Sequence, residues 1–255
     1  MPLYSKPVRI LMHAMVEDMG LLPGQVLSRS KVEAWFGTKY PKVKYGTVAA
    51  HLLRLSTNAP SRLHYNAKSP EDDLFYQIDG GHFRLFDPQK DPAPIVAKLG
   101  GFEIADDDKQ PAGELDHQSA EFAYERDLRN FLAKNMARIE SGLRLYEDEG
   151  ITGVEFPVGG RFVDILGVDL ANQYVVIELK VSKGYDRVVG QLLRYMAWIE
   201  QHHAEPGQAV RGVIVAREIS DDLRLACSKL PTVTLFEYSL SVTLKPISLS
   251  VPGTE

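Results

Sequence analysis

The chain has 255 residues, of which 44% are hydrophobic and 25% charged, with a formal net charge of −5 and one cysteine. This length and composition are typical of a globular protein with one large or two modest domains. The single cysteine, Cys227, excludes an intrachain disulfide and a cysteine-rich zinc site, and it suits a reducing cytoplasm. No apolar run reaches about 18 residues and no charged-then-apolar leader is present, so we expect a cytoplasmic protein without membrane span or signal peptide.

Charge is segregated along the chain. Residues 28–68 contain eight Lys or Arg and one acid, a net charge of +7, whereas residues 103–127 contain nine acids and two basic residues, a net charge of −7. Such segregation indicates that the two segments have separate tasks, and a basic segment is typical of nucleic-acid binding. The acidic overall balance therefore does not exclude DNA as a partner.

The first third of the chain predicts three helices followed by a hairpin. Apolar residues recur at helical spacing in 5–19 and 47–56, and Ser28 or Ser30 can cap a helix through 31–36. Strands at 74–78 and 82–86 flank Asp79-Gly80-Gly81, a tight-turn signal. This order favours an α+β winged-helix domain over residues 1–90.

A winged helix places its third helix in the major groove, while basic loop residues contact phosphates. On the third helix we expect Val48, Leu52 and Leu55 to face inward and His51 and Arg54 to face outward. The alternative is a small α+β domain with a solvated basic face. We favour DNA binding because the basic residues concentrate around the third helix and the hairpin. The candidate DNA-binding residues are Lys42, Lys44, Thr47, His51, Arg54, Arg62, His64 and Lys68.

A linker is predicted over residues 91–118. Proline, glycine and acidic residues are dense there and hydrophobic periodicity is weak. Its acidic run is either a solvated tether or a competitor of DNA for the basic domain.

Residues 119–255 predict a second domain with the order αβββαβαββ, an α/β arrangement with an αβββαβ core. Its first helix has a carboxylate on the packing side, because Glu125 precedes Leu128 by three residues and Leu132 by seven. A carboxylate is rarely placed there without a partner. The expected elements are a helix at 119–139, strands at 154–156, 161–168 and 174–181, a helix at 186–201, a strand at 212–216, a helix at 220–229, and strands at 232–238 and 241–247.

Charged residues interrupt two of these apolar strands. Because strand residues alternate between faces, Glu178 and Lys180 share a face, and Asp164 on the preceding strand lies near Glu178 if the two strands pair. Two neighbouring carboxylates form an oxygen-rich site suited to Mg²⁺. A lysine beside them can orient or deprotonate the attacking water, or stabilise charge in the transition state.

The helix that follows adds a polar ridge of Arg187, Gln191 and Arg194 that can approach the same sheet face. The alternative for the acids and the lysine is a surface ion pair on an edge strand. That alternative fits poorly with the apolar neighbours of Glu178 on both sides. We therefore predict a metal-dependent nuclease site.

The combination of these motifs resembles the PD-(D/E)XK nuclease superfamily, and most closely the C-terminal catalytic domain of NucS/EndoMS-type endonucleases. The pattern comprises a helix glutamate at Glu125, Gly160-Arg161 leading to Asp164-Ile165-Leu166, Val175–Lys180, and Gln191 followed by Tyr195; one extra residue separates Arg161 from Asp164. The resemblance implies metal binding by Asp164 and Glu178, catalytic assistance by Lys180, and supporting roles for Glu125 and Gln191. It also implies Mg²⁺ as the cofactor, with Mn²⁺ able to substitute.

The N-terminal third does not resemble the β-rich N-terminal domain of those enzymes. Residues 58–65 (Asn-Ala-Pro-Ser-Arg-Leu-His-Tyr) resemble winged-helix modules attached to restriction-type nucleases. We therefore expect a Mg²⁺-dependent DNA endonuclease of restriction type, modification-dependent forms included, whose winged helix selects the target on double-stranded DNA. The alternatives are a NucS-like endonuclease for mismatched or branched DNA and a catalytically inactive DNA-binding regulator. Cutting both strands needs two sites, so we expect a homodimer, in solution or on DNA only.

Overall fold

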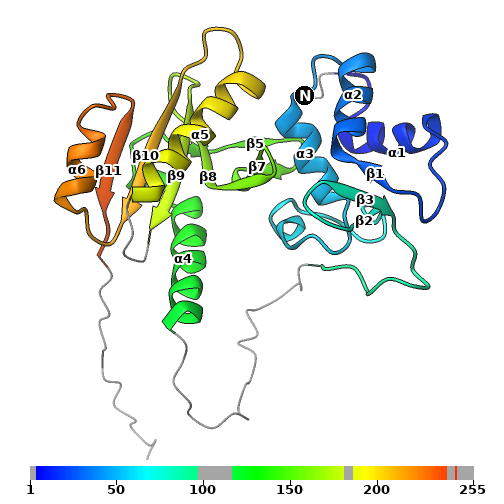
Figure 1. Ribbon diagram of the computed structural model, residues 1–255, viewed down its shortest axis with the longest axis horizontal. Coiled ribbons are helices and arrows are strands. Elements are labelled where there is room, and N and C mark those ends of the chain that lie inside the picture. Colours follow the sequence, from blue (N-terminus) through cyan, green and yellow to red (C-terminus); the bar gives the residue numbers. More distant parts are fainter. Residues whose placement is uncertain (1–3, 97–116, 181–185, 240–244, 246–255) are drawn as a thin grey trace, which may run out of the picture.

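The computed structural model describes residues 4–96, 117–180, 186–239 and 245. We call residues 4–96 the N-terminal unit and residues 117–239 the C-terminal unit. In Figure 1 the N-terminal unit lies on the right, the C-terminal unit lies on the left, and strands β5 and β7 reach across between them. Among the described helices, none combines the length and apolar character needed to cross a membrane.

The N-terminal unit contains the predicted three helices and hairpin. Ser28 caps the second helix by accepting a hydrogen bond from the Lys31 N–H, as expected, and the hairpin strands β2 and β3 pair antiparallel. A two-residue strand that the sequence pattern does not predict pairs with β3 to give the sheet order β1-β3-β2. The elements are α1 (Val8–Asp18), β1 (Leu27–Ser28), α2 (Arg29–Lys39), α3 (Tyr45–Arg54), the 3-10 helix η1 (Pro60–His64), β2 (Phe75–Gln77) and β3 (His82–Leu85).

Helix α3 is buried on all sides. Val48 and Leu52 face inward as predicted, but the prediction that His51 and Arg54 face outward is wrong, since they are 0% and 8% exposed. The reason is that α3 packs against α1 and α2 on one side and against β6 and β7 of the C-terminal unit on the other. Every residue of α3 from Gly46 to Arg54 is buried as a result.

The C-terminal unit is an α/β fold, as predicted. Its main sheet has the order β11-β10-β9-β8-β4, with β7 paired to β8; β9, β10 and β11 are parallel and β8 runs antiparallel to β9. The predicted strand at 241–247 lies almost wholly outside the described residues. The elements are α4 (His117–Lys134), η2 (Met136–Arg138), β4 (Arg144–Leu145), β5 (Glu147–Asp148), β6 (Ile151–Thr152), β7 (Val154–Val158), β8 (Arg161–Val168), β9 (Tyr174–Lys180), α5 (Asp186–His202), β10 (Val210–Ala216), α6 (Asp221–Cys227) and β11 (Val233–Glu237).

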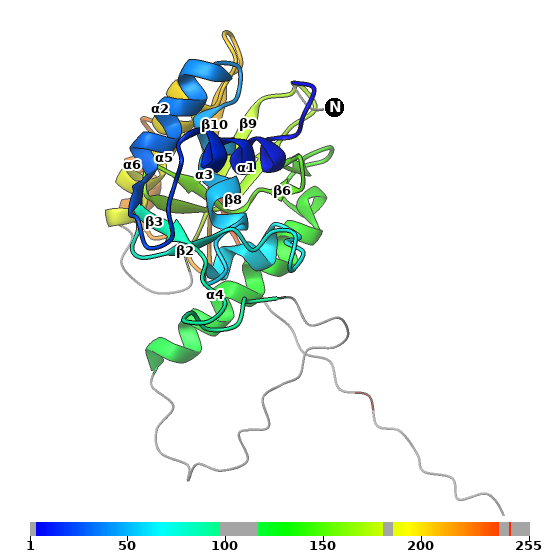
Figure 2. The same ribbon diagram turned by 90° about the vertical axis from the view of Figure 1, so that its right-hand side faces the viewer.

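Helices cover both faces of this sheet, which explains why its central strand β9 is almost continuously apolar. Leu128 and Leu132 of α4 pack in one buried cluster with Ile177 of β9. Leu192 of α5 packs in another cluster with Val176, on the opposite face of the same strand. Figure 2, turned by 90° from Figure 1, shows α4 running below the sheet region and the N-terminal helices in front of it.

The second cluster also joins the two units. Ala50 and Leu53 of α3 and Tyr65 after η1 are buried together with Phe156 of β7 and residues of α5. The approach is close at Gly46, where a Cβ atom would lie 2.9 Å from His203 Nδ1 and 3.0 Å from Phe156 Cζ. A larger residue at this position would push the units apart.

His203 lies in this shared core without a hydrogen-bond partner for either ring nitrogen among the described residues. The rings of Tyr146, Phe156 and Tyr174 surround it at centroid distances of 5.2, 5.0 and 5.1 Å. Burial, with a smaller contribution from Lys44, lowers the pKa of His203 from 6.5 to about 3.

This burial predicts an acid-sensitive fold. Unfolding exposes His203 and lets it bind a proton at its ordinary pKa of 6.5, so stability is lost as the pH falls below that value. Replacement of His203 by Leu is expected to stabilise the protein and to flatten this part of the pH dependence, because both unsatisfied nitrogens disappear. Urea denaturation of the wild type and the variant at about pH 7 and about pH 5 measures both the gain in stability and the weaker pH dependence. A steeper loss of stability in the variant would contradict the expectation.

Candidate active site

Strands β8 and β9 bring the two predicted metal-binding carboxylates together. The strands pair through Ile165 and Ile177, and one further step in the same register places Asp164 opposite Glu178. Asp164 Oδ2 accepts a hydrogen bond of 2.9 Å from the Leu179 N–H. Asp164 is thereby fixed beside the strand that carries Glu178.

Glu178 is a nearly buried acid, 3% exposed, in the middle of the sheet. The side-chain amide of Gln191 on α5 donates a hydrogen bond to Glu178 Oε1, while Oε2 is buried without a hydrogen-bond partner among the described residues. Burial, reinforced by the neighbouring Asp164 carboxylate, raises the pKa of Glu178 to about 9. A free carboxylate oxygen in such a position is a ready ligand for a cation.

Asp164 is perturbed in the same direction. Burial raises its pKa to about 6; the Leu179 N–H and Arg129 oppose this rise, and Glu125 adds to it. Among the described residues no group of three acidic, histidine or cysteine side chains is arranged to hold a metal ion. Mg²⁺, however, keeps several waters and is commonly bound by only one or two protein carboxylates. The unpartnered Glu178 Oε2 and the repulsion between the two acids therefore fit a hard divalent cation.

The structure brings all five candidate catalytic residues together. Lys180, at the end of β9, and Glu125, on α4, both act electrostatically on Asp164 and Glu178: the lysine lowers and the glutamate raises the pKa of each acid. Gln191 makes the direct contact with Glu178. Of the predicted polar ridge, Arg194 also lowers the pKa of Glu178, whereas Arg187 is exposed.

The sequence pattern does not single out Arg129 or Glu155, which lie at the edge of the site. Arg129 stands one helical turn after Glu125 on α4, and its guanidinium lies 2.7 Å from Glu155 Oε1 and 3.7 Å from Asp164 Oδ1. The only signal in the sequence is the four-residue spacing from Glu125, which places Arg129 on the same side of the helix. Glu155 gives no signal at all.

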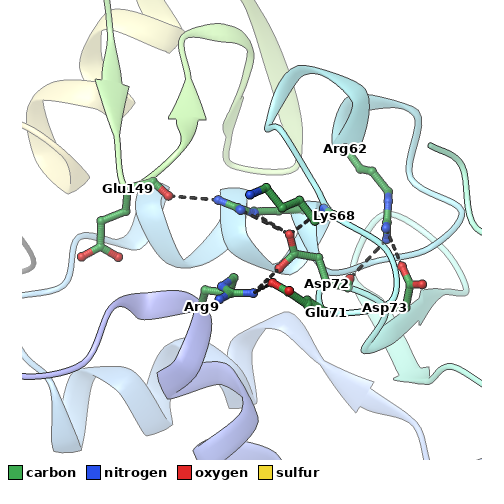
Figure 3. A network of polar contacts seen from close by, with 8 residues as sticks. Arg9, Arg62, Lys68, Glu71, Asp72, Asp73 and Glu149 are labelled. Atoms are coloured by element: carbon green, nitrogen blue, oxygen red, sulfur yellow. Dashed lines mark hydrogen bonds and ion pairs between the residues drawn. The ribbon is translucent and has the colours of Figure 1, made fainter. Parts of the chain in front are cut away.

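Most of the predicted DNA-binding residues are paired inside the protein instead. Figure 3 shows a network around Asp72, whose side chain is fully buried and receives contacts from Arg9 and Arg54 and from the backbone N–H of Lys68. Burial raises the pKa of Asp72, but the Lys68 N–H and the two arginines outweigh it, so the pKa is lowered overall. Arg62 pairs with the adjacent Asp73.

These contacts decide which candidates can reach DNA in this arrangement of the units. Thr47, His51, Arg54 and Arg62 are 4%, 0%, 8% and 1% exposed, so the expected phosphate contacts are not available to them. Two more candidates pair with acids of the C-terminal unit, Lys44 with Glu205 and His64 with Glu155. Lys42 and Lys68 are exposed.

Comparison with protein families matches the two units separately. Residues 124–229 match the Endonuclease NucS C-terminal domain, and residues 7–85 match a domain of unknown function (DUF7669). The first match contains the whole candidate active site.

Several curated relatives are named Endonuclease NucS. The protein from Methanopyrus kandleri is 30% identical over 121 residues, which are 48% of this chain and 43% of the relative. The Pyrococcus abyssi protein is 29% identical over 106 residues, 41% of this chain and 38% of the relative, and the Pyrococcus furiosus protein is 36% identical over 76 residues, 30% and 27% of the two chains. The matches thus span less than half of the length of these relatives.

Two solved structures are similar to part of this chain. The crystal structure of a repair endonuclease from Pyrococcus abyssi is 26% identical with a TM-score of 0.37, covering 50% of this chain and 49% of that chain. The structure of an EndoMS–dsDNA complex is 24% identical with a TM-score of 0.38, covering 52% and 51%. On the family match and the curated relatives, the C-terminal half of this chain carries a NucS-type endonuclease domain of the PD-(D/E)XK superfamily.

Proposed function

We propose that this protein is a divalent-metal-dependent DNA endonuclease that hydrolyses phosphodiester bonds. The observation that carries the proposal is the set of Asp164, Glu178, Lys180 and Gln191, assembled on two adjacent strands and one helix within the NucS-type domain. An acid pair with raised pKa values beside a lysine is an arrangement suited to hold Mg²⁺ or Mn²⁺.

Each residue has a separate task in this proposal. Asp164 and Glu178 would hold the metal ion, which when bound supplies Lewis acidity and a more acidic bound water. The Leu179 N–H and the Gln191 amide fix the two carboxylates through hydrogen bonds. Lys180 would stabilise negative charge that develops on the phosphate. Glu125 would accept a proton or hold a metal-bound water on the α4 side of the site.

For the substrate we propose mismatched or branched DNA, because the curated relatives are all NucS endonucleases. Restriction of foreign DNA, expected from the sequence, is the rival. The order α1-β1-α2-α3-β2-β3 with its three-stranded antiparallel sheet supports a winged-helix N-terminal unit. Since α3 is buried, such a unit would contact DNA through exposed residues such as Lys42 and Lys68.

A cleavage panel tests the activity and the substrate together. Mismatched, branched, methylated, plain duplex and single-stranded DNA are incubated with Mg²⁺ or Mn²⁺, and the products are sequenced. Lys180→Ala is expected to abolish cleavage but to keep DNA binding in Ca²⁺ buffer, whereas Lys229→Ala, at an exposed lysine that follows α6, is the matched control. Failure of the wild-type protein to cut any substrate would refute the proposal.

An inactive DNA-binding regulator would bind DNA but no Mg²⁺ at Asp164 and Glu178, so titration calorimetry with the metal separates it from an enzyme.

Cleavage of both strands calls for two copies of the site, so we propose a homodimer that forms in solution or on DNA. Light scattering with and without a DNA duplex measures this.

A further inference from the structure

A cavity of about 300 Å³ opens beside the candidate catalytic acid Asp164. Both units line it: the N-terminal unit contributes Ser61 and Gln77, and the C-terminal unit contributes Phe162 and Arg129. Any group bound in this cavity lies next to the reacting centre. Glu155 completes the charged part of its lining.

Arg129 is the cation among these lining residues, and its hydrogen-bonding capacity is only partly used. The side chain is 11% exposed, and one terminal nitrogen lies 2.7 Å from Glu155. The other terminal nitrogen is 3.7 Å from Asp164, beyond hydrogen-bond distance, and Nε is buried without a partner among the described residues. Leaving a buried donor unpaired is costly, so these N–H groups favour a bound group that supplies an acceptor.

The chemistry of the cavity specifies this acceptor. A guanidinium offers a planar fork of donors that matches the oxygens of a phosphate. Phe162, 42% exposed, adds an apolar surface for a sugar or a base. We propose that the cavity binds a phosphodiester group of the DNA, adjacent to the bond that is cut, through Arg129. This inference rests on the proposed function, since it takes DNA as the substrate.

Glu155 is the positioning residue for Arg129. Strands β7 and β8 pair at Val154–Ile165 and Phe156–Val163, so a regular ladder would set Glu155 opposite Asp164. Instead Glu155 has a φ of +48°, which takes it out of the ladder. Its carboxylate then lies within reach of Arg129 and, at 3.5 Å, of His64.

The N-terminal unit helps to hold this conformation. The Tyr65 hydroxyl, from a fully buried side chain, donates a hydrogen bond of 2.8 Å to the Glu155 carbonyl. Thr152 donates from the C-terminal unit to the His64 carbonyl at 3.0 Å. A left-handed backbone at a glutamate persists only where its surroundings impose it. The N-terminal unit therefore serves as one wall of the phosphate site.

The test compares Arg129→Gln with Arg126→Gln, which removes an arginine whose side chain is 57% exposed on the same helix. Binding to a fluorescently labelled DNA duplex is measured in Ca²⁺ buffer over a series of salt concentrations, and cleavage is measured in Mg²⁺. Arg129→Gln is expected to weaken binding roughly tenfold and to reduce the salt dependence by about one phosphate contact. The loss should appear in KM more than in kcat. Arg126→Gln should leave all of these values unchanged.

A wild-type affinity and salt dependence in Arg129→Gln would overturn the proposal. If this variant does not fold, as judged by circular dichroism, Arg129→Lys replaces it: it keeps the charge but not the fork, so the salt dependence should stay while affinity falls. Full affinity in Arg129→Lys would overturn the proposal equally. Cleavage by the wild type with no effect of Arg129 defeats this inference alone. Loss of DNA affinity in Arg129→Gln without cleavage by the wild type would support the phosphate contact of Arg129 but defeat its place beside a cut bond, together with the proposed enzyme.

Discussion

Glu178→Gln is expected to abolish DNA cleavage and, in metal-free buffer, to stabilise the protein. Cleavage should fall by more than about a hundredfold, the loss that follows when even the hydrogen-bond partners of metal ligands are removed. Stability should rise because the variant replaces a buried acid, 3% exposed, by an amide that carries no charge.

The raised pKa of Glu178 also predicts how the stability of the metal-free protein changes with pH. Burial and the Asp164 carboxylate raise the pKa of Glu178 from 4.5 to about 9, so between these values the folded protein holds a proton that the unfolded chain releases. The stabilisation by this proton is complete below the pKa of 4.5 that Glu178 has in the unfolded chain. It is lost as the pH rises through the pKa of about 9 in the folded protein. The metal-free wild-type protein should therefore lose stability over this window, and Glu178→Gln should lose less.

Urea denaturation in EDTA across the pH range measures the difference. Asp164→Asn is the companion variant: because the Asp164 carboxylate helps to raise the pKa of Glu178, the loss of stability with rising pH should end at a lower pH in this variant than in the wild type. Added Mg²⁺ should stabilise the wild-type protein and leave Glu178→Gln nearly unchanged. Identical pH profiles for wild type and Glu178→Gln would contradict the assignment of this site.

Phe156→Ala is expected to have the largest effect on stability outside the site. The ring is 0% exposed and lies in the core that the two units share, close to Gly46 of α3 and with its centroid 5.0 Å from that of His203. Removal of a buried phenylalanine side chain lowers the free energy of unfolding by about 3–5 kcal/mol. Since the loss occurs at the contact between the units, both should be destabilised together.

Denaturation followed by circular dichroism and by tryptophan fluorescence separates the possibilities, because Trp35 lies in the N-terminal unit and Trp198 on α5. One coincident transition is expected in the wild type and in the variant. Phe131→Ala, which removes a phenylalanine that is 48% exposed, is the control and should change stability by at most about 0.5 kcal/mol. Two separate transitions in the wild-type protein would show that the shared core does not couple the units.

The candidate site could be predicted from the sequence because its side chains are placed by the local periodicity of strands and helices. Strand alternation places Glu178 and Lys180 on one face, and the helix period places Gln191 on the side of α5 that reaches Glu178. The strands of the C-terminal unit are apolar runs between turn signals, and their predicted bounds are close to those observed. Strands of two residues, such as β1 and β5, are too short to leave such a pattern.

The surroundings of α3 could not be predicted in the same way. His51 and Arg54 are polar, and polarity on a helix normally indicates solvent. Their burial depends on the packing of α3 against β6 and β7 and, for Arg54, on the ion pair with Asp72. Glu155 is a similar case, since nothing in a glutamate between a valine and a phenylalanine indicates a left-handed backbone. These features depend on tertiary partners, which hydrophobic periodicity does not report.

The shared core has a consequence for how this protein can be divided. Helix α3 contributes Ala50 and Leu53 to a cluster whose other members come mostly from the C-terminal unit. A fragment ending after residue 96 and a fragment beginning before residue 117 would each expose part of an apolar interface, yet the two interfaces are complementary. Such fragments, produced together, would reassemble without a covalent connection, as a split enzyme does. By the same logic, either fragment grafted alone onto another protein would carry its half of this apolar interface exposed to solvent.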